Sequence, residues 1–529
     1  MRVTIKKMGI NGEGIGYIDR LPVFVPGALL NEEAEIKVIE RTQRYARAKV
    51  EKIIKRSDKR VKPACGIQHR CGACPYMVCA DEEQLRFKRD NLRQSLIKYA
   101  QIDPKLISEV RPSPAKLHYR NQFKLPLSMQ EGELVNGMYM PNSNIFVPME
   151  TCLIHEEGLE ALRKAILAVL NRHGIRAYDW HQKRGLRHLV VRGFEGRYQC
   201  TLVTGEEQLP QELTDDLLQL EGLVSLWQSI QTAKKTPDIF GPKMILLGGQ
   251  RSLTMHLHGL RIPISPRSFF QLNTAQAANL YACIDAMVEP GCKRIVEAYS
   301  GIGGISMYLK DKAEEVIGIE IIKDAVLDAR KAAERNGIHN VEFICADAAD
   351  KLTYLSKKKS IDVLVVDPPR SGLDDLMLET MLRSRITKII YVSCNPSTLA
   401  KNLAVLSERY EVRQIVPFDM FPHTANLETV VLLSKGEIDS KKVRVEFSLE
   451  DMDMSGFQND ATYGQIKERV LQQTGLKVSS LYIAQVKQKY GIIERENYNK
   501  PKSENAKQPK CPPEKEAAIT EALKFFGMI

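Results

Sequence analysis

The segment RIVEAYSGIGG, residues 294–304, decides the fold of this chain. A short apolar run followed by a glycine-rich turn is typical of a strand that passes into a helix beside a bound ligand. The next apolar run, EVIGIEI at 315–321, carries Glu320 about twenty residues beyond Gly301. A carboxylate at that position can bind both hydroxyls of a ribose. The segment therefore predicts a nucleoside site at the edge of a sheet.

The same alternation continues toward the C-terminus. Residues 323–337, KDAVLDARKAAERNG, have helical periodicity, and Gly337 is placed to end that helix. Further apolar runs that predict strands are VEFICAD (341–347), IDVLVVDPP (361–369), KIIYVSC (388–394), EVRQIVPF (411–418) and ETVVLLS (428–434). Strands that alternate with helices predict an α/β fold with a parallel, doubly wound, Rossmann-like sheet.

The bulk composition narrows the class of protein. A chain of 529 residues is too long for one core, so three or four domains are expected. Because no apolar run reaches about 18 residues, no membrane span is expected. The first residues, MRVTIKKMGINGEG, lack the apolar core of a signal peptide, which favours a cytoplasmic protein. The net charge of +11 fits either a solvated basic surface or a polyanionic partner.

Four regions follow from changes in pattern along the chain. Residues 1–58 alternate short β-type runs with glycine turns and carry a basic excess, which predicts a small nucleic-acid-binding barrel. Residues 59–265 are mixed α/β and begin with a turn-rich cysteine segment. Residues 266–437 contain the wound sheet, and residues 438–529 form an appendage of short helices with a Lys/Pro-rich linker.

The cofactor turn lacks the features of a phosphate site. Gly303 is followed by Gly-Ile-Ser, so the full G-x-G-x-x-G signature is absent, and no Lys-Ser/Thr pair follows it. A nucleoside without phosphates fits better, and S-adenosylmethionine (AdoMet) is the obvious candidate. Asp347 ends the third strand, where it can contact the nucleoside or simply cap the next helix. Asp367 begins a rigid Asp-Pro-Pro turn at the carboxyl edge, where ligands bind in such folds.

Cys394 stands at the end of the apolar run IIYVS, directly before Asn395-Pro396 and a new helix. A cysteine at the mouth of a helix is exposed to the positive end of the helix dipole, which favours the thiolate. The alternative is an inert buried cysteine. The sequence pattern by itself leaves both interpretations open.

The chain resembles the RNA uracil-C5 methyltransferases over most of residues 1–436. The motifs that carry this resemblance are SPRSFFQLN (265–273), VVDPPRSGL (365–373), SCNPSTLAKNL (393–403) and DMFPHTANLETVVLL (419–433). The resemblance implies a class I AdoMet-dependent methyltransferase domain. In that family the cysteine of the third motif is the nucleophile and the glutamate of the last motif is the general base, here Cys394 and Glu428.

The chemistry explains these two residue types. C5 of uracil is a poor nucleophile, and addition of a thiolate to C6 converts the ring to an enolate that can attack a methyl sulfonium. A base must then remove the C5 proton so that the thiolate can leave. The target base must also leave its stack to reach both groups.

The resemblance also implies a set of residues that hold AdoMet or line its pocket. These are Gln271, Tyr299, Glu320, Asp347 and Asp367. Three positions depart from the family pattern: Glu297 replaces a usual Asp, Ser300 a frequent Cys, and Gly304 an Asn found in some members.

The chain has eleven cysteines, and four of them fall between Cys65 and Cys79. Such clustering in a reducing compartment suggests a metal, and four thiolates can bind zinc or an iron–sulfur cluster. By resemblance to the rRNA-directed branch of the family, a [4Fe–4S] cluster is expected, with zinc as the alternative. The implied ligands are Cys65, Cys71, Cys74 and Cys152. Cys79 is expected not to be a ligand, and the spacing is not that of radical AdoMet enzymes, so a structural or RNA-binding role is expected.

The N-terminal barrel resembles a TRAM domain. Barrel, cluster and the Ser-Cys-Asn-Pro motif together favour 23S rRNA over tRNA as the substrate of a monomeric enzyme. HYRNQFK (118–124) and KRGLRHLVVR (183–192) offer cations and aromatic rings for RNA, or form ordinary strand surface. Three alternatives stay open: a tRNA uridine C5-methyltransferase, an exocyclic-amino methyltransferase and a non-catalytic RNA chaperone. Against the second, Arg370 stands where such enzymes usually carry an aromatic residue.

Overall fold

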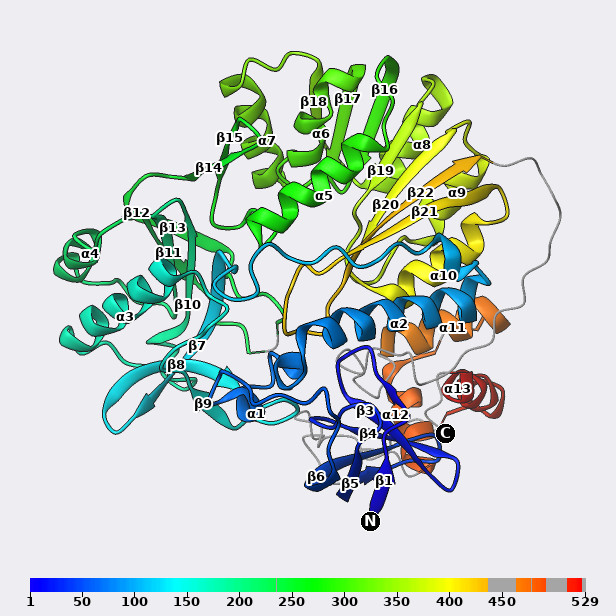
Figure 1. Ribbon diagram of the computed structural model, residues 1–529, viewed down its shortest axis with the longest axis horizontal. Coiled ribbons are helices and arrows are strands. Elements are labelled where there is room, and N and C mark those ends of the chain that lie inside the picture. Colours follow the sequence, from blue (N-terminus) through cyan, green and yellow to red (C-terminus); the bar gives the residue numbers. More distant parts are fainter. Residues whose placement is uncertain (235, 436–462, 477, 491–510, 526–529) are drawn as a thin grey trace. The chain divides into compact units, whose positions relative to one another are not determined.

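The computed structural model describes residues 1–234, 236–435, 463–476, 478–490 and 511–525 (Figure 1). Contacts divide the chain into two compact units, Met1–Met452 and Asp453–Ile529. Across these described ranges, no helix combines the length and the apolarity needed to cross a membrane. The parts of the predicted appendage at 438–462 and 491–510 lie outside the described residues.

The N-terminal residues form a six-stranded sheet in the order β1-β5-β6-β4-β3-β2. Alternation of apolar and polar residues buries Ala34 and Ile36 on one face of the long strand β5. A Cβ atom on Gly16 would lie 2.3 Å from Val3, so only glycine permits the close approach of strands here. The strands are β1 (Arg2–Thr4), β2 (Lys7–Met8), β3 (Gly14–Ile18), β4 (Leu21–Val25), β5 (Glu33–Arg41) and β6 (Ala46–Lys55).

A helical connection leads from this sheet to the central region. It contains α1 (Gln68–Cys71), η1 (Pro75–Val78), α2 (Asp81–Ala100) and η2 (Pro104–Leu106). The central sheet has the order β13-β12-β11-β10-β7-β8-β9, with α3 and α4 packed on its apolar core. Its elements are β7 (Gln122–Gln130), β8 (Glu133–Tyr139), β9 (Phe146–Pro148), α3 (Glu157–Arg172), β10 (Leu186–Phe194), β11 (Arg197–Thr204), α4 (Gln211–Leu218), β12 (Leu223–Ile230) and β13 (Lys243–Gly249).

The wound sheet has the order β18-β17-β16-β19-β20-β22-β21. Its first five strands are parallel, and β22 runs antiparallel between β20 and β21. Its strands are β16 (Cys292–Ala298), β17 (Ala313–Glu320), β18 (Val341–Cys345), β19 (Val363–Val366), β20 (Lys388–Ser393), β21 (Tyr410–Phe418) and β22 (Glu428–Lys435), preceded by the hairpin β14 (Leu253–Leu257) and β15 (Leu260–Ile264). This confirms the predicted doubly wound α/β fold.

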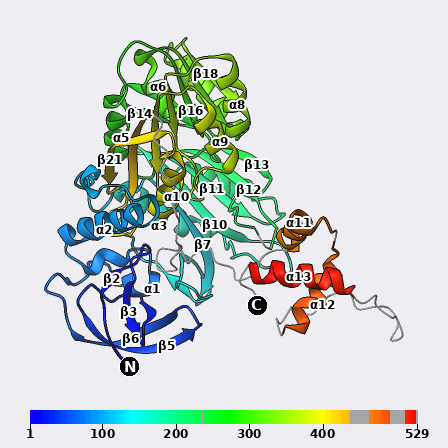
Figure 2. The same cartoon turned by 90° about the vertical axis from the view of Figure 1, so that its right-hand side faces the viewer.

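Helices cover both faces of the wound sheet. One apolar cluster packs α5, α6 and α7 on the first face, and a second packs α8, α9 and α10 on the opposite face (Figure 2). The helices are α5 (Thr274–Ala286), α6 (Gly304–Tyr308), α7 (Lys323–Arg335), α8 (Ala348–Lys358), α9 (Asp375–Arg383) and α10 (Pro396–Leu406), with the short η3 at Lys310–Lys312. Such two-sided burial explains why the strands β16 to β20 are nearly continuous apolar runs.

Helix α2 packs on the wound sheet although the sequence grouped it with the central region. Leu92, Leu96 and Tyr99 belong to the same buried cluster as the strands and α10. At its N-terminal end, Phe87 instead packs with the core of the N-terminal sheet. One helix thus connects two cores that lie far apart in the sequence.

The second unit has a small core of its own. Its helices are α11 (Tyr463–Thr474), α12 (Ser480–Lys489) and α13 (Pro513–Phe525). Ile466, Val470, Ile483 and Leu523 are among its fully buried apolar residues. The helical character expected for the appendage is therefore present in the described part of this unit.

Candidate active site

The carboxyl edge of the wound sheet gathers the residues that the sequence singled out. Parallel neighbouring strands end at the same edge, where ligands bind in such folds. Tyr299 follows β16, Glu320 ends β17, Asp367 follows β19 and Cys394 follows β20. Because the strands β17, β16, β19 and β20 are neighbours in this order (Figure 1), residues almost one hundred positions apart in the sequence lie along the same edge of the sheet.

Cys394 and Glu428 are neighbours across an antiparallel strand pair. Strand β20 pairs with β22, and Ser393 lies opposite Thr429. The next position on β20 and the preceding one on β22 therefore place Cys394 beside Glu428. The carboxyl group is buried and the thiol is half-buried. The two residues predicted to act together therefore lie next to each other at the end of the β20–β22 strand pair.

The surroundings of Cys394 oppose ionisation of its thiol. The pKa of Cys394 is raised to about 12, first by burial and then by the negative charges of Glu428 and Asp367, while Arg370 acts in the opposite direction. The positive end of the α10 dipole was expected to favour the Cys394 thiolate, but burial and the acidic neighbours outweigh this effect. Asn395 accepts hydrogen bonds from the first amides of α10, those of Ser397 at 3.0 Å and Thr398 at 3.4 Å. Those amides are therefore occupied by Asn395.

Three carboxyl groups beneath the site have raised pKa values. Burial, followed by the charge of Asp367, raises the pKa of Glu428 well above its ordinary value, while Arg370 lowers it. Burial raises the pKa of Asp367 to about 7 and that of Glu297 to about 8. Carboxyl groups with raised pKa values are typical of sites at which protons are transferred.

Arg370 is a site residue that the sequence reasoning did not assign. Its guanidinium donates to Asn426 Oδ1 at 2.6 Å, and its carbonyl accepts from Asn395 at 3.3 Å and Thr398 at 3.2 Å. It lowers the pKa of both Cys394 and Glu428. Its place directly after the Asp-Pro-Pro turn was the signal that could have identified it.

The glycine turn after β16 is open in the way a nucleoside requires. Gly301 has φ +54°, and no atom lies within 4 Å of a Cβ atom placed on it. Glu320 accepts the amide of Gly301 at 2.9 Å and that of Ile322 at 2.8 Å. Tyr299 also has a positive φ of 64°, and within the described residues the buried hydroxyl of Ser300 has no hydrogen-bond partner. This open turn beside a carboxylate fits AdoMet.

The other two residues in this part of the prediction are Asp347, which follows β18, and Gln271, which precedes α5. The side chain of Asp347 caps α8 by accepting the amides of Ala349 at 3.0 Å and Asp350 at 3.1 Å. Asp347 is exposed. Burial, followed by the charges of Asp374 and Asp347, raises the pKa of Tyr299 to about 12, so Asp347 lies within electrostatic range of Tyr299. Gln271 is buried, and its carbonyl accepts from Asn121 at 3.0 Å.

The loop that precedes Glu428, residues 419–427, is held by α2. The buried ammonium of Lys88 forms an ion pair with Asp419 and donates to the carbonyl of Phe421 at 3.0 Å. Gln84 accepts the amide of His423 at 3.1 Å. These contacts anchor the loop that leads into β22, whose first residue is Glu428.

The four cysteines of the expected metal site lie in the same part of the fold, with Cys74 within electrostatic range of the other three. The pKa of Cys74 is raised to about 12, first by burial and then by charge repulsion from Cys152, Cys71 and Cys65. Cys65, Cys74 and Cys152 pack on one cluster that also includes Phe421 of the 419–427 loop. Four thiols suit zinc or a [4Fe–4S] cluster. In the chain as described, no group of three or more such donors is assembled into a metal-binding arrangement.

The basic segment 183–192 includes an arginine that is partly accessible, Arg187, and one that is buried, Arg192. Arg187 lies over the rings of Trp180 and Tyr178, at 4.6 and 5.3 Å from their centroids. Arg192 is buried and donates to the carbonyl of Ser268 at 2.7 Å, which is a structural contact. Only part of the segment 183–192 is therefore available to a nucleic acid.

Comparison with known proteins identifies two matching domain families. Residues 250–436 match the family described as tRNA (Uracil-5-)-methyltransferase, and residues 1–50 match the TRAM domain. An uncharacterised RNA methyltransferase of Listeria innocua is 36% identical over 446 residues, covering 82% of this chain and 97% of the relative. One from Bacillus cereus is 37% identical over 442 residues, covering 82% and 96%.

A solved structure is similar over the same extent. The Pyrococcus abyssi tRNA (uracil-54, C5)-methyltransferase, in complex with S-adenosyl-L-homocysteine, has a TM-score of 0.66 and 26% sequence identity. The similarity covers 82% of this chain and all of that chain.

Proposed function

Since this chain belongs to the RNA (uracil-5-)-methyltransferase family and carries a TRAM domain, we propose that it methylates C5 of a uridine in 23S rRNA. AdoMet is the proposed methyl donor, and the product is 5-methyluridine. The observation that carries this proposal is the adjacency of Cys394 and Glu428 at the carboxyl edge of the wound sheet.

The adjacency supplies both steps that C5 methylation needs from protein side chains. The Cys394 thiolate adds to C6 of the flipped uracil, and the ring electrons move toward O4 so that C5 becomes nucleophilic. After C5 has gained the methyl group, the Glu428 carboxylate takes the C5 proton. The electrons of the C5–H bond re-form the C5–C6 double bond, and Cys394 leaves as a thiolate.

The positive charge of Arg370 favours the ionised forms of Cys394 and Glu428. Its guanidinium lowers the pKa of Cys394 and Glu428, so it favours the thiolate and the carboxylate over their neutral forms. The exposed position of Arg370 lets solvent weaken this effect in the free protein. A base bound over the site excludes that solvent, which strengthens the attraction.

The open glycine turn supports a nucleoside at the other end of the site. AdoMet supplies an electrophilic methyl group on a sulfonium centre when it is bound. The residues proposed to hold it are Gln271, Tyr299, Glu320, Asp347 and Asp367. Among these, Glu320 ends β17, and its carboxylate is the proposed acceptor for the ribose hydroxyls.

The proposed second cofactor is a [4Fe–4S] cluster, with zinc as the alternative. Its proposed ligands are Cys65, Cys71, Cys74 and Cys152. The TRAM domain and the proposed cluster favour 23S rRNA as the substrate. The bacterial tRNA branch of the family typically lacks both the barrel and the cluster. We also propose a cytoplasmic monomer with four parts, residues 1–58, 59–265, 266–437 and 438–529.

A tRNA substrate is the second candidate. It is favoured by the similarity to the Pyrococcus abyssi enzyme, which is named for uracil-54 of tRNA. An exocyclic-amino methyltransferase is disfavoured because such chemistry needs no thiol beside the base.

Mapping 5-methyluridine in cellular RNA tests the proposal. Cells that lack this protein should lose 5-methyluridine from a defined site in 23S rRNA and keep it in tRNA. Expression of the wild-type chain should restore it, and expression of Cys394→Ala should not. Loss of the modification from tRNA alone would favour the second candidate, and loss of an N-methyl base would contradict uridine chemistry altogether.

A further inference from the structure

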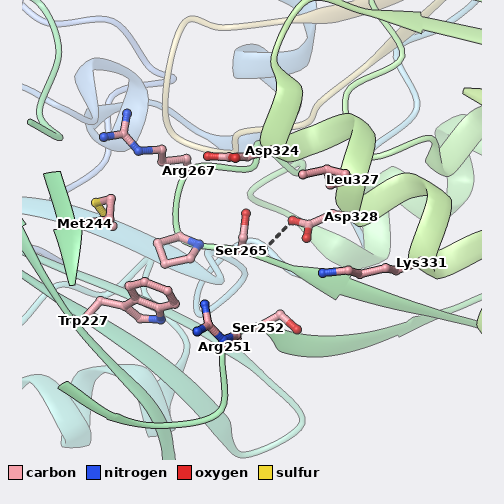
Figure 3. Close-up of a pocket in the computed structure, with 11 residues that line it drawn as sticks. Trp227, Met244, Arg251, Ser252, Ser265, Arg267, Asp324, Leu327, Asp328 and Lys331 are labelled. Carbon is pink, nitrogen blue, oxygen red and sulfur yellow. Dashed lines mark hydrogen bonds between the residues drawn. The ribbon is translucent and has the colours of Figure 1, made fainter. Parts of the chain in front are cut away.

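A small cavity lies where the central sheet meets α7 of the wound domain. Its volume is about 210 Å³. Trp227 and Arg251 lie on one side of it, and Leu327, Asp328 and Lys331 of α7 lie on the other (Figure 3). Ligand pockets for drug-sized molecules usually measure about 300–1,000 Å³. This cavity therefore suits a ligand about as large as one nucleoside.

One wall of the cavity is a fixed aromatic ring. The indole N–H of Trp227 donates to Ser225 Oγ at 3.0 Å, which fixes the orientation of the ring on β12. Met244 of the adjacent strand β13 extends this wall, and the Trp227 side chain is only partly buried. An oriented ring with an accessible face is a stacking platform for a nucleobase.

The charges around the cavity favour an anion at its mouth. Arg251 and Lys331 are exposed, and neither forms an ion pair with another described residue. The opposing carboxylate of Asp328 is occupied, because it accepts from Ser265 N at 2.8 Å and Ser268 Oγ at 2.7 Å. Asp324, the other acidic residue, is exposed and can accept a ribose 2′-hydroxyl, the group that distinguishes RNA from DNA.

The cavity is also connected to the active site through the chain. The turn 265–268 forms its floor, and this turn leads directly to Gln271 of the proposed cofactor site. Asp328 and the buried Arg192 hold the turn from two sides. The opposite wall, α7, begins three residues after Glu320. A ligand in the cavity would therefore contact two segments that adjoin proposed cofactor residues in the sequence, and none of the residues that line the cavity is itself a proposed site residue.

We propose that this cavity binds one unstacked nucleotide of the RNA substrate, distinct from the target uridine. The base stacks on Trp227, a phosphate lies between Arg251 and Lys331, and the 2′-hydroxyl donates to Asp324. The inference rests on the proposed function for the identity of the RNA, and it adds a second point of contact that fixes the RNA relative to Cys394.

Tryptophan fluorescence tests this site directly, because the chain has two tryptophans, Trp180 and Trp227. In the full-length Trp180→Phe protein, fluorescence arises from Trp227 alone. Addition of a short single-stranded oligouridine should quench it, and fluorescence anisotropy of the labelled RNA should report binding separately. Trp227→Ala should weaken binding by roughly 5- to 100-fold.

Charge variants in the Trp180→Phe background test the phosphate contact. Arg251→Ala and Lys331→Ala should each lower the slope of log affinity against log salt by about 0.7. Lys357→Ala is the matched control, because Lys357 is exposed on α8, which packs on the opposite face of the wound sheet. Its salt dependence should equal that of the parent protein.

The outcomes separate this inference from the proposed function. RNA binding or methylation without quenching of Trp227 would overturn the nucleotide site alone. Charge variants that behave like Lys357→Ala would overturn it as well. RNA that binds nowhere on the chain would overturn both the site and the proposed function.

Discussion

At the residue scale, the site holds a thiol whose environment disfavours the reactive form. Cys394 is half-buried between two acidic groups, Glu428 and Asp367, and Arg370 is the opposing cation. A thiolate is the nucleophile in such chemistry, so reactivity depends on shifting this balance. A thiol that stays protonated until the substrate arrives is protected from alkylation and oxidation in the free protein.

The pH dependence of Cys394 alkylation tests this balance. Because the pKa of the thiol is raised to about 12, the rate of modification by iodoacetamide should keep rising with pH well above pH 9. Glu428→Gln removes a negative neighbour and should shift the profile to lower pH, and Arg370→Ala should shift it to higher pH. Mass spectrometry of the Cys394 peptide measures the rate. A plateau near pH 8 in the wild-type protein would contradict the proposed environment.

Glu428→Gln should trap the covalent enzyme–RNA adduct. An amide cannot accept the C5 proton, so the methylated base should stay bonded to Cys394. The expected loss of turnover is on the order of 100-fold or more. A denaturing gel with labelled RNA should show a shifted band, absent in Cys394→Ala. Turnover at the wild-type rate would contradict the role of Glu428.

At the scale of elements, two helices hold the chain next to a proposed catalytic residue and an expected metal ligand. Helix α2 holds the 419–427 loop through Lys88 and Gln84, and Glu428 follows that loop directly. The first turn of α3 does the same for a cysteine of the expected metal site, because Glu160 accepts the amide of Cys152 at 3.1 Å. In each case a buried polar side chain of a helix holds the backbone next to a residue of a proposed site, Glu428 in the first case and Cys152 in the second.

The network around Glu160 should make stability depend on acid. Burial alone would raise the pKa of Glu160, but hydrogen bonds from His155 and Arg163 lower it to about 2. A carboxylate with a lowered folded-state pKa contributes stability above pH 4.5, and this contribution is lost as the pH falls toward 2. Between pH 6 and 3 it should decrease by roughly 2 kcal/mol.

Urea unfolding of the wild type and Glu160→Gln measures this difference. The variant should be less stable at pH 6 and should show a smaller loss on acidification, because Gln has no proton to gain. Equal acid dependence in the two proteins would show that Glu160 does not carry this contribution.

At the scale of the whole molecule, the cysteine site lies where separate cores meet. Cys74 and Cys152 pack with Phe421 of the active-site loop, whereas Cys79 belongs to the core of the N-terminal sheet. The amide of Tyr76, two residues after Cys74, donates to the carbonyl of His423 at 2.9 Å. A cofactor bound by these cysteines would therefore stabilise the join between the N-terminal sheet, the central region and the loop before Glu428.

Metal analysis of the purified protein tests the cofactor at this join. Four iron atoms with four sulfides per chain are expected, and one zinc atom without sulfide would favour the alternative. Cys74→Ser should lose most of the bound metal, since it removes one of four thiolate ligands. Cys345→Ser is the control, because Cys345 is exposed and far from the cluster in the chain. Unchanged metal content in Cys74→Ser would contradict the site.

Much of the fold was predictable because strands and helices of a doubly wound sheet have strong local patterns. The runs that end at Glu320 and Cys394 are strands in the structure, and the family and fold predictions are confirmed. Asp347 shows the limit of local reasoning, since both of its proposed roles depended on which groups lie nearby. Its side chain caps α8 at an exposed position beside Tyr299.

The sequence by itself determined which functional features follow the strands: a glycine turn, a carboxylate predicted to bind a ribose, an Asp-Pro-Pro turn and a cysteine, each at the end of an apolar run. Only the tertiary structure decided that α2 supports the Glu428 loop, that Arg370 faces the thiol and that Trp227 shares a cavity with α7. The reason is distance along the chain. Periodicity and turn chemistry act between residues a few positions apart, whereas Lys88 and Asp419 are 331 positions apart and meet only in the folded protein.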